Sequence, residues 1–195
     1  MANLITLETY KDAVGITSST HDFVLTSLVE SASQLVKTYC NNTFVDYFTS
    51  NKVETYSINY TTTSVQLTES PVNTIVSVQE RDSISKAYNT LTADLEYYFD
   101  ETTDSIFRSN GANGYKTFPR GPGAVVVTYT AGYANCPTDL KLAVIDLVTY
   151  YFKTESKQRQ TLAGASIQNQ SSTSVRNSVA FPDHIKRVLD LYKNY

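Results

Sequence analysis

The chain has 195 residues, which is enough for one domain or for a compact domain that carries an insertion. Its residues are 41% hydrophobic and 18% charged, the formal net charge is −3, and neither sign forms a long run. The apolar content excludes a chain that is disordered throughout, and the lack of clustered Lys and Arg argues against a broad basic face that grips nucleic acid. Abundant Thr and Val, with 15 Tyr and no Trp, favour a large share of β structure.

The amino terminus has no signal-peptide pattern, since no basic residue precedes Lys11 and no apolar run of the required length follows. The longest aliphatic run, residues 124–127, is far too short to cross a bilayer. We therefore expect a protein made in a cytoplasm, without membrane contact, in which Cys40 and Cys136 are free thiols.

Two helices are expected first. The spacing predicts a short helix at residues 7–14 that ends at Gly15, and Ser19 with Asp22 resembles a capping box that opens a longer helix. Apolar residues then recur every three or four positions and form one stripe, consisting of Val24, Leu28, Ala32, Leu35 and Tyr39.

Residues 52–130 change to the two-residue period of half-buried strands. The alternating segments centre on Tyr56, Ile58 and Tyr60, on Val65 and Leu67, on residues 75–78, on Leu95, Tyr97 and Phe99, and on Val125, Val127 and Tyr129. Gly-rich turns at residues 111–114 and 120–123 interrupt the pattern. We predict an antiparallel β module inserted between helices.

Helix returns after Pro137, with Asp139 in a first turn where negative charge is favourable. This helix carries two apolar stripes: Leu140, Val144, Leu147 and Tyr151 form one, and Leu142, Ile145 and Phe152 form the other. A helix that is apolar on two sides lies inside its bundle or against another subunit. Residues 158–178 are polar and without period, and Pro182 suits the start of a last helix with Ile185, Val188, Leu189 and Tyr192 on its apolar face.

The predicted fold is therefore α+β. Residues 1–50 and 131–195 form a small helical bundle, residues 52–130 form the large inserted antiparallel β module, and residues 158–181 form a flexible polar arm before the C-terminal helix.

A catalytic or metal-binding constellation is not evident in the sequence, and no cofactor is expected. The two histidines, His21 and His184, have no His or Cys neighbour at the short spacing that zinc sites use. A Cys–His pair between Cys136 and His184 stays open as an alternative, whereas Cys40 is expected to be a small buried hydrophobe. The sequence thus favours a protein that is not an enzyme.

Two further surfaces allow two interpretations each. The acidic group at Asp94, Glu96, Asp100, Glu101 and Asp104 fits a solvated hairpin tip better than a calcium loop, because its spacing does not match the EF-hand. The tyrosines, including Tyr97, Tyr98, Tyr115 and Tyr129, could pack in the sheet or stack on sugars.

Several segments, in order along the chain, resemble the head–tail connector, or adaptor, proteins of tailed bacteriophages. The strongest is residues 127–133 (VTYTAGY) followed by Pro137-Thr138-Asp139-Leu140-Lys141, which is similar to the family's strand, its AGY turn and the start of its central helix. Residues 32–40 with Phe44, residues 70–78 and residues 181–192 add further matches. The chain departs from the family in its enlarged β region at 80–120 and in its long polar arm.

This resemblance implies a structural protein of the phage neck, in the virion between capsid and tail, assembled in the host cytoplasm. It implies a ring, commonly of twelve subunits, under the portal protein and next to a stopper or tail protein. Double-stranded DNA would pass through the lumen without sequence-specific binding.

The contact surfaces are predictions from the residues. Leu142, Ile145 and Phe152 are expected to face a neighbouring subunit. Residues 158–195 are expected to carry the portal contact through Ile185, Val188, Leu189 and Tyr192, unless this last helix only completes the protein's own bundle. The alternative function is a carbohydrate-binding or adhesive β module of a phage or bacterial surface structure, which predicts exposed tyrosines in one cleft.

Overall fold

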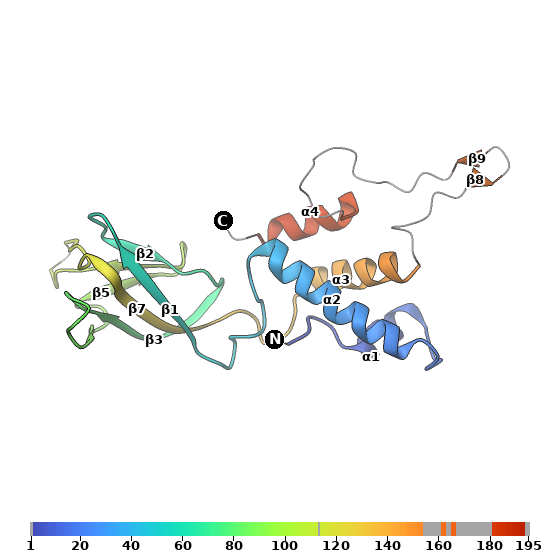
Figure 1. Ribbon diagram of the computed structural model, residues 1–195, viewed down its shortest axis with the longest axis horizontal. Helices are drawn as coiled ribbons and strands as arrows, with labels where there is room; N and C mark the ends of the chain where they lie inside the picture. Colours follow the sequence, from blue (N-terminus) through green and yellow to red (C-terminus); the bar gives the residue numbers. More distant parts are fainter. Residues whose placement is uncertain (1, 113, 154–160, 163–164, 167–180, 194–195) are drawn as a thin grey trace. The chain divides into compact units, whose positions relative to one another are not determined.

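The computed structural model describes residues 2–112, 114–153, 161–162, 165–166 and 181–193. The chain divides into two compact units: a helical unit, Met1–Asn42 with Asn135–Tyr195, and a β unit, Thr43–Ala134. The α+β class is confirmed (Figure 1). The β unit begins about eight residues earlier and ends four residues later than expected from the sequence. Its start lies earlier because Thr43 and the residues that follow it form hydrogen bonds within the β unit.

Helix α1 (Leu7–Val14) forms where the spacing predicted it. The Thr6 hydroxyl accepts a hydrogen bond from the Thr9 backbone N–H at 3.0 Å, which satisfies one of the free donors of the first turn. Gly15 ends the helix in the left-handed conformation, with φ of 74°.

Helix α2 (Asp22–Cys40) also forms, but its expected capping box is wrong. His21 occupies the N-cap without a side-chain hydrogen bond, and the Asp22 carboxylate binds Lys11 at 2.8 Å instead of reaching back to the chain. The buried face of α2 lies mostly one position further along the chain than the expected stripe. Its apolar residues that face the core are Leu25, Val29, Ala32, Val36 and Cys40. Of the predicted stripe, Ala32 alone is buried, while Val24 is 49% exposed.

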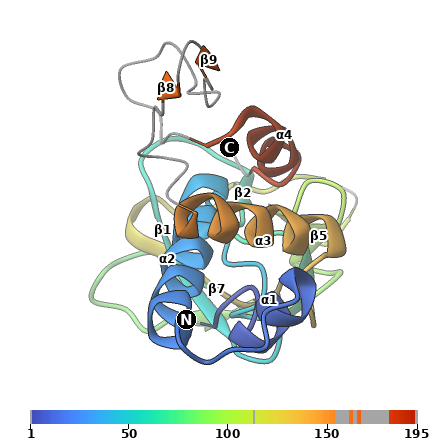
Figure 2. The ribbon, with the colours of Figure 1, turned by 90° about the vertical axis from the view of Figure 1, so that its right-hand side faces the viewer.

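Helix α3 (Thr138–Phe152) packs against α2, and α4 (Asp183–Leu191) packs against both (Figures 1 and 2). Pro137 and Pro182 each stand one residue before their helix. Of the predicted arm, the structure describes two short antiparallel strands, β8 (Thr161–Leu162) and β9 (Ala165–Ser166). The rest of the predicted arm, residues 158–160, 163–164 and 167–180, lies outside the described residues.

The β unit contains two sheets, and all pairings between their strands are antiparallel, as predicted. The first sheet has the order β1-β7-β3-β4 (Lys52–Ile58, Gly121–Ala131, Val72–Glu80, Asn89–Thr90), and the second has the order β2-β6-β5 (Ser64–Gln66, Ser105–Arg108, Tyr97–Asp100). Tyr60 and Leu95, which were expected to continue strands, lie outside them and are 74% and 52% exposed. The sheets enclose a core that includes Val78, Ile106, Val125, Val127 and Tyr129.

Gly132 permits the turn that ends β7. Its φ is +94°, and a Cβ placed on it would lie 2.1 Å from the Phe44 carbonyl oxygen. The approach is close because the neighbouring Tyr133 N–H donates to this same oxygen at 2.6 Å, while the Gly132 N–H donates to Pro71 O at 2.7 Å. The AGY turn therefore requires glycine for both conformation and space.

Candidate assembly surface

One side of α3 forms the centre of the helical unit. Leu140, Val144 and Leu147 are fully buried, and Ala143 and Val148 are buried beside them. These residues recur every three or four positions, so they form one face, which is covered by the helices that pack on α3. The first predicted stripe thus serves the monomer, except that Tyr151 is only half-buried.

The second predicted stripe of α3 is exposed to solvent at its first residue only. Leu142 is 60% exposed, whereas Ile145 and Phe152 are half-buried. The Phe152 ring lies edge-on to His21 with centroids 5.6 Å apart, and Thr149, on the same face, lies 3.2 Å from the Tyr10 hydroxyl. Contact with a neighbouring subunit through this stripe stays a prediction, and Leu142 is the one of its three residues that is free to make it.

The start of α2 exposes Phe23, which was not predicted as a surface residue, and Val24, which was expected on the apolar stripe. Phe23 is 90% exposed and Val24 is 49% exposed, while Val14, at the end of α1, is 39% exposed. The sequence does indicate that this region exposes apolar side chains. Residues 23, 24, 25, 28 and 29 are all apolar, which is more than one buried stripe can hold. Exposed Phe and Val side chains on neighbouring helix ends are typical of an association surface.

The apolar face of α4 packs inside its own helical unit. Ile185 and Leu189 are 1% and 0% exposed, and Val188 is half-buried. The Tyr192 hydroxyl donates to both carboxylate oxygens of Asp139, at 2.6 and 2.8 Å, and these hydrogen bonds lower the pKa of that carboxyl. The structure favours the alternative in which the last helix completes the bundle. A portal contact through these four residues has not been tested and stays a prediction.

The cysteines behave as buried thiols. Burial is the main reason that the pKa of Cys40 rises to about 12 and that of Cys136 to about 11, so both stay protonated at neutral pH. The charged groups that act on Cys136 belong to Lys141, Asp139 and Lys37, and His184 is exposed on α4. The thiol thus lacks the activated state that a Cys–His nucleophile needs. Within the described ranges, no three His, Cys, Asp or Glu residues are placed to hold a metal ion.

The acidic group of the β unit is engaged in turns. The Asp100 carboxylate accepts hydrogen bonds from the backbone and hydroxyl of Thr102 at 3.0 and 2.7 Å, and from the Thr103 hydroxyl at 2.8 Å. These bonds lower the pKa of Asp100. The Asp104 carboxylate accepts from the Val72 N–H at 3.2 Å. The hairpin interpretation therefore accounts for these carboxylates, and the structure gives no support to a calcium loop.

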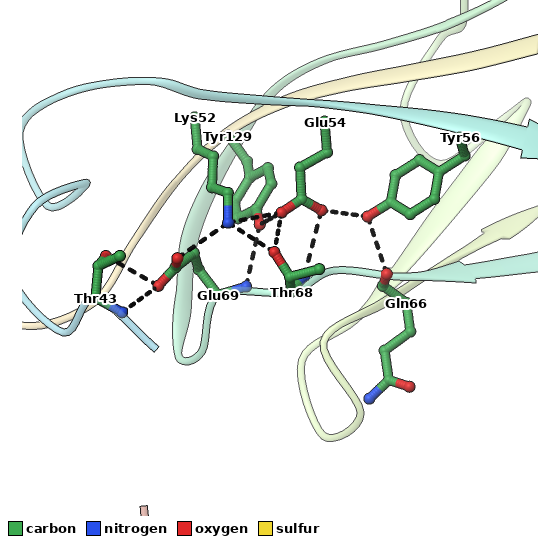
Figure 3. Close-up of polar contacts among 8 residues, drawn as sticks. All are labelled: Thr43, Lys52, Glu54, Tyr56, Gln66, Thr68, Glu69 and Tyr129. Carbon is green, nitrogen blue, oxygen red and sulfur yellow. Dashed lines mark hydrogen bonds and ion pairs between the residues drawn. The ribbon is translucent and has the colours of Figure 1, made fainter. Parts of the chain in front are cut away.

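A partly buried ionic network ties the start of the β unit to its strands (Figure 3). The Lys52 ammonium lies 2.9 Å from Glu54 and 3.0 Å from Glu69. The second oxygen of Glu69 accepts from the Thr43 N–H at 2.8 Å, and the Tyr129 hydroxyl donates to Glu54 at 2.9 Å. Because Thr43 lies two residues after the C-cap of α2, the network fixes the chain where the β unit begins.

The charges of this network stabilise one another. Burial alone would lower the pKa of Lys52, but the bonds and charges of Glu54 and Glu69 outweigh it and raise that pKa. Burial alone would raise the pKa of Glu54, but hydrogen bonds from Thr68, Tyr56, Lys52 and Tyr129 outweigh it and lower that pKa. Such a compensated network fits a structural role, because each charge has its partners.

The family model of the head completion protein matches residues 3–195. No curated protein matches the chain. In the part of the chain that the structure describes, no helix combines the length and the apolar character needed to cross a membrane.

Solved structures with a similar fold come from gene transfer agent particles. One is the neck of an empty particle computed with C6 symmetry, at 14% identity and a TM-score of 0.62, covering 98% of this chain and 90% of the other. A second is the neck of a native particle computed with C12 symmetry, at 14% identity and a TM-score of 0.59, covering 100% and 96%. The third, a native virion, has 15% identity and a TM-score of 0.61, covering 98% and 90%.

These likenesses show a shared fold across both units. The family match likewise spans the helical unit and the β unit, including the AGY turn and the helix that follows it. The chain therefore belongs to the head completion protein family.

Proposed function

We propose that this protein is a structural subunit of a phage neck, where it forms a ring under the portal protein, extends the DNA channel and joins the capsid to the tail. The observation that carries this proposal is the family match over residues 3–195. The fold it shares with proteins of particle necks computed with C6 and C12 symmetry supports a ring, and twelve subunits fit both symmetries. The ring belongs to the virion, and its subunits are made in the host cytoplasm.

A ring requires a head-to-tail contact between two different surfaces of the subunit, with a rotation that closes. The helical unit exposes apolar side chains on two helices: Leu142 on α3, and Phe23 with Val24 at the start of α2. Burial of these side chains against a neighbour would remove apolar surface from water, which favours association. Ile145 and Phe152 are half-buried on the same predicted stripe, so Leu142 is the residue of the stripe most open to a neighbour.

The charge of the chain suits a conduit for DNA. Its net charge is −3, and the β unit contains six Lys and Arg against ten Asp and Glu. Five of the six cations make contacts within the β unit: Lys52, Arg81, Lys86, Arg108 and Arg120. Double-stranded DNA would therefore slide through the lumen without phosphate contacts that hold it in place.

Complementation of a phage that lacks this gene tests the proposal. We expect filled capsids without tails, which acquire tails when purified protein is added. Deletion phage whose filled capsids still acquire tails would overturn it.

The portal contact needs a separate test. A protein shortened at residue 157 loses α4, so it also loses Ile185 and Leu189 from the core of the helical unit. The double charge reversal Lys186→Glu and Arg187→Glu changes only exposed positions of α4 and keeps the bundle. If heads bind this variant and retain DNA as they do with the wild type, the outer side of α4 does not carry the portal contact.

A further inference from the structure

The β unit contains an open cleft along β5 that the proposed neck role does not use. Two adjoining hollows of about 400 and 530 Å³ share Asp94, Tyr97, Tyr98 and Asp100. Tyr115 closes the first hollow, and Glu101 borders the second. We call these six residues and the space between them the tyrosine cleft.

The cleft presents aromatic rings to solvent. Tyr98 is 57% exposed and Tyr115 is 73% exposed. The Tyr115 ring lies 5.9 Å from that of Phe107, and its backbone pairs with Ser109 in a β-bridge, so the ring is held rather than left on a free loop. Exposed tyrosines gathered in one cleft are also what the carbohydrate-binding alternative predicts.

The charged residues that line the cleft favour a positively charged ligand. Asp94 and Asp100 line both hollows, and Glu101 lines the second. Arg108 is the one cation among the described lining residues, and it is 2% exposed and bound to Glu80 at 2.9 and 3.0 Å. Lys116, which is exposed nearby, acts on Glu96 and does not line the cleft. The carboxylates therefore have no cation within the cleft that neutralises them.

Hydrogen bonds fix one carboxylate of the cleft and the backbone of a second aspartate. Three hydrogen bonds from Thr102 and Thr103 fix the Asp100 carboxylate. Asp94 adopts a left-handed conformation with φ of 60°, and its N–H donates to the Tyr97 carbonyl at 2.9 Å. Carboxylates and tyrosine faces gathered at one site attract a cation by charge and by cation–π contact.

We propose that the tyrosine cleft binds an arginine or lysine side chain presented by a segment of another neck protein. The cation is inferred from the cleft alone, whereas the partner's place in the neck rests on the proposed function. Uncompensated carboxylates repel DNA phosphate, and they favour a cation over a neutral sugar, which brings no charge to meet theirs. Five of the ten acidic residues of the β unit lie within residues 94–104, so the attraction is strongest at this edge.

The test uses the full chain labelled with ¹⁵N and a tetra-arginine peptide, acetylated and amidated, followed by NMR. We expect shifts of residues 93–101 and 107–115 that weaken as salt is added. Tyr115→Leu and Asp94→Asn should each weaken binding roughly 3- to 10-fold. Tyr60→Leu, at a tyrosine that is 74% exposed outside the cleft, and Asp82→Asn, at an exposed acid, are the matched controls and should stay within about twofold.

Two results would overturn the cleft proposal. One is peptide binding that spreads over the surface and responds equally to the cleft variants and their controls. The other is binding of maltotriose or chitotriose at these residues in place of the peptide, which would favour the carbohydrate alternative. If the peptide does not bind but deletion phage still require the protein for tail attachment, the cleft proposal alone fails. If the peptide binds and tails attach without the protein, the neck role alone fails.

Discussion

Packed aliphatic helices hold the helical unit together, whereas the β unit adds a partly buried ionic network and a glycine with no room for a side chain. Charge differs as well, since the β unit has four more acidic than basic residues and the helical unit has one more basic than acidic residue. We therefore expect the two units to respond to different changes. Acid and single backbone changes should affect the β unit first, and loss of apolar surface should affect assembly through the helices.

The largest expected effect is that of Gly132→Ala in the β unit. The new Cβ would meet the Phe44 carbonyl oxygen at 2.1 Å, so the backbone must move in addition to adopting a strained φ. We expect a loss of about 3 kcal/mol or more, measured by thermal unfolding. Gly15→Ala in the helical unit is the matched control, because its φ is +74° but nothing lies within 4 Å, so about 1 kcal/mol is expected. Equal losses would contradict the contrast between the units.

The second-largest loss of stability is expected when the Glu54 charge is removed. Glu54→Gln leaves Lys52 with one carboxylate partner in a partly buried site, and we expect a loss of about 3 kcal/mol at neutral pH. Asp82→Asn breaks an exposed ion pair with Lys86 and should cost less than about 0.5 kcal/mol. Urea unfolding of both variants measures the difference, and similar losses would show that the network does not stabilise the β unit.

The dependence of stability on pH gives a second test of the ionic network. Because the pKa of Glu54 is lowered on folding, its contribution is fully present above its ordinary value of about 4.3 and is lost as pH falls through the folded pKa. The pKa of Lys52 is raised, so its contribution is present below about 10.4 and is lost as pH rises through the folded pKa. Glu54→Gln should flatten the acid side of the stability profile, and an unchanged acid side would contradict the assignment.

The smallest effect on stability is expected at the assembly surface. Leu142→Asp changes a side chain that is 60% exposed, so unfolding should shift by less than about 0.5 kcal/mol while subunits no longer associate. Ile145→Asp, at a half-buried position, should also give soluble monomers if this stripe is an interface. Light scattering measures the association. If Ile145→Asp is insoluble while Leu142→Asp still assembles, the stripe belongs to the monomer's core.

Much of the fold could be predicted from local patterns. Gly15 marked the end of α1, the two stripes located α3, and alternation located most of the strands. The stripe of α2 was misplaced by one position because apolar residues at 23–25 and 28–29 allow two registers, and spacing alone cannot choose between them. Packing of α2 against the other helices of the unit decides that Leu25 and Val29 face inward.

The candidate sites were harder to predict, because they depend on contacts between distant residues. Lys52, Glu69 and Tyr129 are separated by up to 77 positions, and no periodicity brings them together. The tyrosine cleft likewise combines β5 with a loop that contains Tyr115. The burial of Ile185 and Leu189 could not be read from their amphipathic spacing, since a face that packs inside the bundle has the same pattern as one that meets a partner.

Electron microscopy of the purified protein, alone and mixed with the portal protein of its phage, tests whether the protein forms a ring under the portal. We expect a ring of subunits seated under the portal, with a channel on the portal axis, and no such ring with Leu142→Asp. A portal whose appearance is unchanged by saturating wild-type protein would contradict the account.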